Sequence, residues 1–275
     1  MYTAPRSPQS IGGVIDSSIN LFKASFRHCW QASLLSALVS VFITVWLQLR
    51  LLALASAAAA SGNTASTVAA ATAVFSSPSI WIAYLALIAV ALAVNLMITM
   101  TINEVAAGRG SNALSNLKSG FTLLPGAVLV TIVLIVPVIV GFILLVVPGI
   151  YLIGRWCLWA AAYTEQRGRA FEALGRSWAL VGGNWWRTFI VLSVIGVVAA
   201  VVLFVIGAVW GYIAAAIGLA PATRVIVQQA LQGFTSVVYT PAFAAAIVAI
   251  YQDLKLRKGG ADIEARLGGI EAPQA

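Results

Sequence analysis

Long apolar stretches alternate with short basic amphipathic segments along this chain. The apolar stretches come in pairs, and each pair is preceded by one amphipathic segment, near residues 11–29, 111–124 and 169–187. Crossing the hydrocarbon core of a bilayer takes about 20 mostly apolar residues. Six stretches reach or approach that length, so we predict membrane spans at about residues 30–54, 80–102, 128–147, 149–163, 188–212 and 224–251.

The fourth span is the shortest and contains Arg155. Pro148-Gly149 separates it from the third span, and these residue types favour a turn. We therefore expect the third and fourth spans to form a tight hairpin. If they were instead one span, the protein would have five spans and its termini would face opposite sides.

The amphipathic segments have the spacing of surface helices. In the first segment, apolar residues recur three and four positions apart, at Ile11, Ile15, Ile19, Phe22 and Phe26. Asp16, Lys23 and Arg27 occupy the opposite face. A shift of 159 residues aligns this segment with the third one, placing Ile15 on Leu174. The middle segment is the weakest copy. The predicted fold is therefore an all-α polytopic membrane protein with six transmembrane helices in three hairpins, each preceded by a cytoplasmic interfacial amphipathic helix.

Two interpretations of these segments remain open. A helix with a basic polar face lies in the membrane interface, where each Lys or Arg gains about 1 kcal/mol from anionic lipid. The segments would then recognise anionic phospholipid in the cytoplasmic leaflet through Lys23, Arg27, Lys118, Arg169 and Arg176. Alternatively, they only anchor the hairpins that follow them. We favour the anchor, because interfacial aromatic and basic residues anchor membrane proteins generally.

Composition and charge support the membrane assignment. The 275 residues are 61% hydrophobic and only 9% charged, with a mean hydropathy of +0.98. The net charge is +8, and thirteen of the sixteen Lys and Arg residues fall on one side of the predicted spans. Because short cytoplasmic connections are enriched in Lys and Arg, both termini are predicted to be cytoplasmic. We read this basic excess as a topology signal and expect no nucleic-acid partner.

The domain organisation follows from these spans. We expect a polar N-terminal tail at residues 1–10, a membrane domain at 11–258 and a cytoplasmic C-terminal tail at 259–275. No apolar segment with a cleavage site precedes the first span, so that span would act as an uncleaved signal anchor.

One set of polar residues lies within or at the ends of the spans. Arg155 is the most informative, since an ionisable residue in a span is a functional candidate by default. Its expected partners in an intramembrane polar cluster are Glu104, Asn95, Gln228 and Gln232. The cluster could hold the helices together or bind a substrate or lipid headgroup, and the structural role is favoured. The stripe that holds Gln228 and Gln232 is likewise either one wall of a polar pathway or interhelical glue.

Nothing in the sequence forms a recognisable catalytic or metal-binding set. His28 is the single histidine, and Cys29 and Cys157 lack metal-ligand or CxxC spacing. No HExxH motif, P-loop or nucleophile elbow occurs. We therefore expect no enzymatic activity, no catalytic residues, no metal and no cofactor.

Residues of the third repeat and the tail resemble a known bacterial family. The segment 147–152 (VPGIYL), with Arg155, Glu165 and Ser177-Trp178, and the segment 251–258 (YQDLKLRK) carry the resemblance. They are similar to the membrane domain attached to some glycerophosphoryl diester phosphodiesterases, which is related to the YciC-like inner-membrane proteins. The family's tail usually has an acidic residue where this chain has Gly259, which puts a salt bridge there in doubt.

The resemblance implies a polytopic protein of the bacterial inner membrane. The hydrolytic activity in the family's name belongs to a barrel domain that this sequence lacks, so we do not expect it here. The first functional hypothesis is a non-enzymatic protein that assists envelope or lipid organisation by binding anionic lipid, protein partners or a second copy of itself. The alternative is a small-molecule or lipid transporter or channel with a polar site around Arg155. An intramembrane lipid enzyme is a third and weaker hypothesis.

Overall fold

The computed structural model describes residues 2–60, 69, 72 and 76–270. These residues form α-helices joined by short connections and include no strand. The principal helices are α1 (Ile11–Ala60), α3 (Pro78–Ala106), α4 (Ala113–Leu144), α5 (Val146–Trp156), α6 (Trp159–Glu165), α7 (Ala170–Val181), α8 (Trp185–Ala216) and α9 (Pro221–Ile270).

Six helical stretches are long and apolar enough to cross a membrane, which matches the predicted number of candidate spans, and the described residues confirm the all-α class. Five of them lie in α1, α3, α4, α8 and α9. The sixth, Val146–Glu165, comprises α5 and α6, with Cys157 and Leu158 between them. This composition fits a multi-pass membrane protein.

The surface segments differ from the prediction in two of three places. The first is continuous with its span in α1, and the middle one is continuous with its span in α4. No glycine or proline interrupts residues 14–60, so nothing breaks the helix where the polar face gives way to the apolar stretch. Only α7 is a separate helix. It ends at Val181, Gly182 follows as the C-cap, and Gly183 adopts a positive φ of 80°, which glycine tolerates at no steric cost.

The hairpin turn between α4 and α5 lies three residues before the predicted one. Leu145, in an extended conformation, separates the two helices. Pro148 lies in the first turn of α5, where its missing N–H would have no partner in any case. A Cβ on Gly141 would lie 3.0 Å from the backbone nitrogen of Gly149, so glycine permits the close contact between the two helices.

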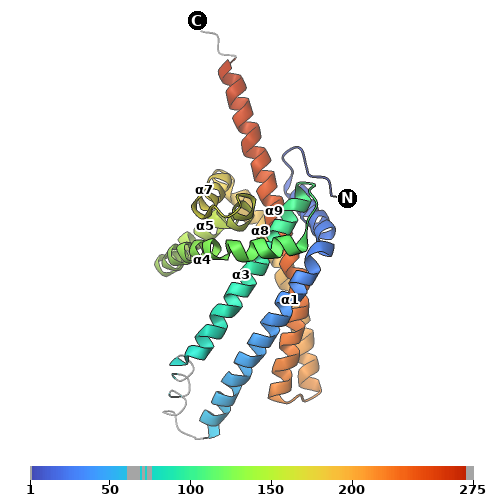
Figure 1. Cartoon of the computed structure of the whole chain (residues 1–275), viewed down its shortest axis with the longest axis vertical. Helices are drawn as coiled ribbons and strands as arrows, with labels where there is room; N and C mark the ends of the chain where they lie inside the picture. Colours follow the sequence, from blue (N-terminus) through green and yellow to red (C-terminus); the bar gives the residue numbers. More distant parts are fainter. Residues whose placement is uncertain (1, 61–68, 70–71, 73–75, 271–275) are drawn as a thin grey trace.

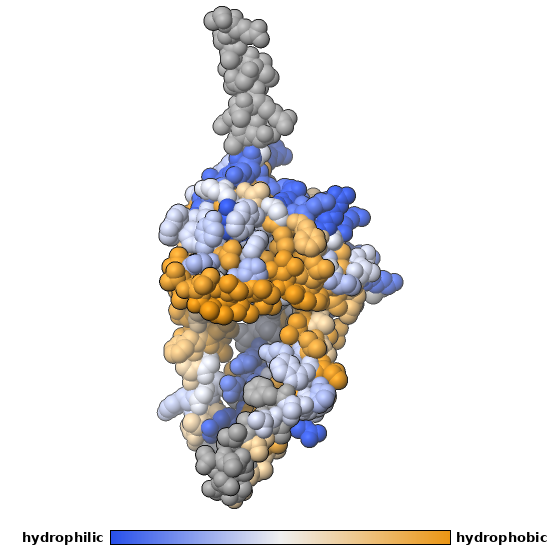
Figure 2. Space-filling model, turned by 90° about the vertical axis from the view of Figure 1, so that its left-hand side faces the viewer, coloured by the Kyte–Doolittle hydropathy of each residue, from blue (hydrophilic) through white to orange (hydrophobic). Residues whose placement is uncertain are grey.

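The direction of this hairpin could not be predicted from hydropathy. In Figure 1, α1, α3 and α9 run along the long axis of the molecule, whereas α4 runs across it near the end that holds both termini. The turn of the hairpin exposes its side chains, for example Ile143 (77%) and Val147 (74%). Seen from that side, a broad apolar band lies directly below a hydrophilic end (Figure 2).

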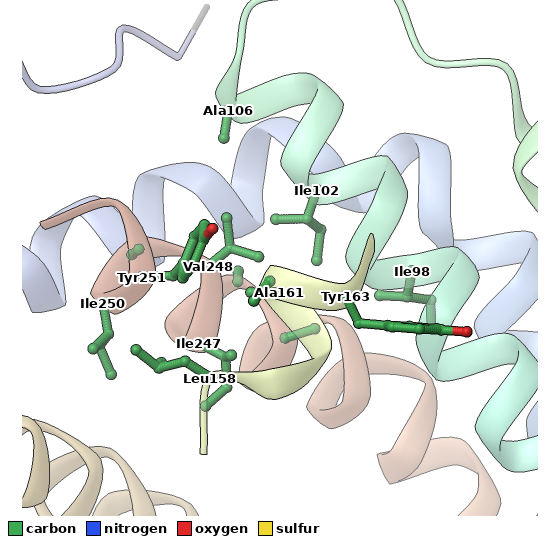
Figure 3. Packing of buried hydrophobic residues seen from close by; sticks show 14 of the residues in the cluster. Ile98, Ile102, Ala106, Leu158, Ala161, Tyr163, Ile247, Val248, Ile250 and Tyr251 are labelled. Atoms are coloured by element: carbon green, nitrogen blue, oxygen red, sulfur yellow. The ribbon is translucent and has the colours of Figure 1, made fainter. Parts of the chain in front are cut away.

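The core also lies towards the end that holds the termini. There α1 packs against α9 and α3, and α6 packs against α3, α7 and α9. Ile98 and Ile102 of α3 belong to one buried cluster with Leu158, Tyr163 and the α9 residues Ile247 and Val248 (Figure 3). Small residues such as Ala161 and Ala245 are fully buried and let the helices approach closely. The packing of this core therefore fixes the positions of the polar residues that lie at the same end of the molecule.

Candidate functional site

A buried carboxylate ties three parts of the polar end together. Asp253 of α9 is 2% exposed and accepts from Arg187 of α8 at 3.1 Å and from Arg257 at 3.0 Å. It also accepts the backbone N–H of Gln9 at 2.8 Å, and the carbonyl of Gln9 accepts from Arg187 at 2.6 Å. The N-terminal segment is thereby fastened to α8 and α9. Sequence reasoning treated Asp253 only as part of a family motif.

A second carboxylate joins α6, α7 and α9. Glu165, the last residue of α6, accepts from Lys255 at 2.6 Å and lies 3.9 Å from Arg176. The hydroxyl of Tyr251 also donates to it. Arg176, predicted to bind lipid, is therefore paired with protein.

Two asparagines extend the network to α3 and α4. Asn116 donates to Glu104 at 2.7 Å and to Thr101 at 3.1 Å. Asn103 donates to the hydroxyl of Thr164 at 2.9 Å. Glu104 thus has a partner on α4 that the sequence analysis did not name.

Arg155 lies between aromatic rings of α5 and α7. Its guanidinium is 4.2 Å from the ring centroid of Trp178 and 5.5 Å from that of Tyr151. It donates to the carbonyl of Trp178 at 3.0 Å, while Ser177 donates to the carbonyl of Arg155 at 2.9 Å. The Nε of Arg155 is buried and has no partner among the described residues.

The predicted polar cluster is therefore not assembled as expected. Among the described residues, no hydrogen bond or ion pair joins Arg155 to any of its four predicted partners. Asn95 is half-buried, and its backbone carbonyl accepts from Thr99 at 2.8 Å. Gln228 and Gln232 are exposed and line a cavity of about 490 Å³ between α8 and α9. The physical reason is the course of the chain: α5 packs on α4, α7 and α8, and the described contacts of α5 do not bring Arg155 to α3 or α9.

The predicted lipid-interface residues divide into paired and unpaired cations. Arg169 pairs with Glu172 at 3.2 Å, and Arg176 pairs with Glu165. Lys118 is exposed. Lys23 and Arg27 line a cavity of about 370 Å³ between α1 and the α3–α4 connection.

Arg109 belongs to the same region, although the sequence analysis counted it only for topology. It lines the cavity with Lys23 and Arg27, and it lines two neighbouring cavities of about 410 and 340 Å³. Gly108 and Gly110 flank it, and Gly108 has a positive φ of 68°. The two glycines on either side of Arg109 are the feature of the sequence that could have predicted a sharp turn there.

Tyr2 and the cysteines complete the candidate chemistry. Tyr2 lines the cavity that contains Lys23 and Arg27. Burial raises the pKa of its phenol, which keeps the hydroxyl neutral. Cys29 and Cys157 are free thiols. In the part of the chain that the structure describes, no three His, Cys, Asp or Glu side chains are grouped so that they could hold a metal ion.

No family model, curated protein or solved structure matches the chain. The resemblance to the phosphodiesterase-associated membrane domains therefore stays a prediction. The class that the fold defines is an all-helical protein with six helices long and apolar enough to span a membrane. A hydrophilic surface covers the end that holds both termini (Figure 2).

Proposed function

We propose that this chain is a non-enzymatic membrane protein that organises anionic phospholipid. The observation that carries the proposal is a group of unpaired cations at the polar end of a molecule that exposes an apolar hairpin beside that end. Lys23, Arg27 and Arg109 form no ion pair with any described residue, and the apolar band of Figure 2 lies just below the hydrophilic end. Each such cation at a membrane surface contributes about 1 kcal/mol of attraction to anionic lipid.

We further propose that the α4–α5 hairpin stays within one leaflet. It runs across α1, α3 and α9 in Figure 1, so its exposed apolar side chains would occupy acyl-chain space beside the polar end. In this arrangement four helices, α1, α3, α8 and α9, cross the bilayer. The even number keeps both termini on one side. The excess of Lys and Arg on that side favours the cytoplasm, and the family resemblance favours the bacterial inner membrane.

A direct test uses the tryptophans as reporters of the surrounding lipid. The full chain is reconstituted into zwitterionic vesicles that contain equal small fractions of either a brominated anionic or a brominated zwitterionic phospholipid. We expect stronger quenching by the brominated anionic lipid, and we expect salt to reduce the difference because exposed charges are screened. Equal quenching by the two lipids would reject the proposed function.

A transport function is the second candidate. The α8–α9 cavity, lined by Gln228, Gln232 and Thr235, offers polar groups among otherwise apolar helices. The alternative predicted from sequence centred on Arg155, which instead contacts Trp178 and Tyr151. Liposome flux of wild-type protein and of the variants Gln232→Leu and Arg155→Ala tests both versions. Loss of flux in Gln232→Leu alone would favour a pathway between α8 and α9. Loss of flux in Arg155→Ala alone would favour the site around Arg155 that was predicted from the sequence.

Protein partners and self-association belong to the same proposal. The half of α8 near the α8–α9 turn exposes large apolar side chains, such as Phe204 (75%) and Tyr212 (78%). Lipid or a second copy of the chain would cover them equally well. Mass measurement in lipid nanodiscs distinguishes a single copy from an oligomer.

A further inference from the structure

The cavity between α1 and the α3–α4 connection has an unusual charge composition. Three of its lining residues are the cations Lys23, Arg27 and Arg109, and no Asp or Glu lines it. None of the three cations forms an ion pair or a side-chain hydrogen bond with another described residue. The cavity measures about 370 Å³. We call this cavity the hollow. The three like charges around it repel one another unless an anion lies between them.

Other lining groups add hydrogen-bonding capacity without negative charge. His28 lines the hollow, and its Nδ1 is buried with no partner among the described residues. Ser111 also lines it, and its hydroxyl oxygen accepts from Asn116 at 3.3 Å, which leaves its own proton free to be donated. A buried polar atom without a partner costs free energy, so a ligand that supplied the missing hydrogen bond would be stabilising.

The two neighbouring cavities serve as internal comparisons. Arg109 lines both, but Glu165 lines both as well, and Glu104 lines one of them. Their carboxylates would repel an anion and already accept hydrogen bonds from Lys255 and Asn116. The hollow on the α1 side is therefore the better anion site of the three.

We propose that this hollow binds a phosphate monoester group. Several oxygens on one doubly charged phosphate can accept from Lys23, Arg27 and Arg109 together, and charge-assisted hydrogen bonds are the strong ones. The predicted apolar stretch of α1 begins at Trp30, two residues after His28, so we expect the hollow to lie at headgroup level. The phosphate can come from a lipid with a terminal phosphate, such as phosphatidic acid, or from a soluble phosphate ester. The lipid version rests on the proposed function, whereas the soluble version does not.

The experiment measures binding to the full chain in detergent and in nanodiscs. In detergent, inorganic phosphate is titrated against chloride at matched ionic strength, and unfolding temperature is recorded. In nanodiscs, phosphatidic acid is compared with phosphatidylglycerol at equal charge, and enrichment around the protein is measured by lipid mass spectrometry. We expect a rise in unfolding temperature with phosphate, enrichment of phosphatidic acid, or both.

Variants identify the site. Arg109→Gln removes a lining cation, and Arg169→Gln is the matched control because Arg169 is exposed and paired with Glu172. We expect Arg109→Gln to weaken phosphate or phosphatidic acid binding at least about tenfold, and Arg169→Gln to leave it unchanged. Lys23→Gln gives a second, independent loss if Arg109→Gln does not fold.

Each outcome has a defined consequence. Response to phosphate alone supports the site with a soluble ester, and response to phosphatidic acid alone supports it with a lipid headgroup. Equal response to phosphate and chloride together with equal enrichment of the two lipids would overturn the site, as would binding that survives both Arg109→Gln and Lys23→Gln. In that case the brominated-lipid test still decides the proposed function, because it depends on general attraction to anionic lipid and not on this hollow.

Discussion

Asp253→Asn should destabilise the protein far more than loss of an exposed ion pair does. The Asp253 side chain is 2% exposed and lies between Arg187 and Arg257, whose side chains are 21% and 29% exposed. Replacing the carboxylate by an amide leaves two partly buried guanidiniums side by side without an anion. Breaking a buried pair by removing one partner costs about 3–5 kcal/mol, which corresponds to a fall in unfolding temperature on the order of 10 °C.

Glu172→Gln is the matched control. Glu172 also pairs with an arginine within one helical turn, but the side chains of Arg169 and Glu172 are 71% and 60% exposed. Such a pair contributes about 0–1 kcal/mol. Thermal unfolding of both variants in the same detergent, followed by tryptophan emission, measures the difference. The reasoning is refuted if Asp253→Asn unfolds within one or two degrees of Glu172→Gln.

A second readout follows the N-terminal segment. Gln9 is held by its N–H donating to Asp253 and its carbonyl accepting from Arg187. We expect Asp253→Asn to release this segment, so trypsin should cleave after Arg6 faster than in the wild type while Glu172→Gln is cleaved at the wild-type rate. Adding Arg257→Gln to Asp253→Asn removes one uncompensated charge and should restore part of the lost stability.

Three further predictions concern the packing and course of the helices. Gly120→Ala would place a Cβ 2.8 Å from the carbonyl oxygen of Ala93. It should therefore separate α4 from α3 and lower the free energy of unfolding by about 1–3 kcal/mol, measured by thermal unfolding. Gly207→Ala is the control and should leave the stability unchanged, because no atom lies within 4 Å of the added Cβ. In a chain with Cys29 and Cys157 replaced by serine, Leu144→Cys at the hairpin turn should resist impermeant maleimide from both sides, while Ser79→Cys at the start of α3 should react from the side opposite the termini. Reaction of Leu144→Cys from that same side would show that the hairpin crosses the bilayer. Arg155→Ala should lower the free energy of unfolding by about 1–2 kcal/mol. Arg155→Lys should lose most of the same amount, because an ammonium cannot stack on the Trp178 ring as a planar guanidinium does. If Arg155→Lys were as stable as the wild type, the aromatic contact would be rejected as the cause.

The helical class and the six apolar stretches were predictable because both depend on composition over about 20 residues. The direction of α4 was not, because hydropathy records length and says nothing about the angle between helices. Pro148 illustrates a local limit: proline favours a turn, but it is equally at home in the first turn of a helix, and here Leu145 forms the break.

The site was predictable in part, for the same reason. Charged residue types pointed to the polar end, but pairing depends on tertiary contacts between helices distant in sequence. Arg176 and Arg187 read alike as basic residues after the fourth span, yet they pair with Glu165 and Asp253, respectively. Arg155 was expected to need a polar partner within the membrane, and stacking on Trp178 and Tyr151 meets part of that need.

The pairing pattern explains why one hollow stands out despite a net charge of +8. Glu165, Glu172 and Asp253 together engage five cations, all on α7, α8, α9 or the residue just before α7. Their contribution is structural, because a guanidinium already held by a carboxylate has less to gain from lipid. The cations of α1 and the α3–α4 connection have no such partner among the described residues. Lys23, Arg27 and Arg109 line one cavity that no carboxylate lines, and Arg109 is therefore the first residue to alter in a binding experiment.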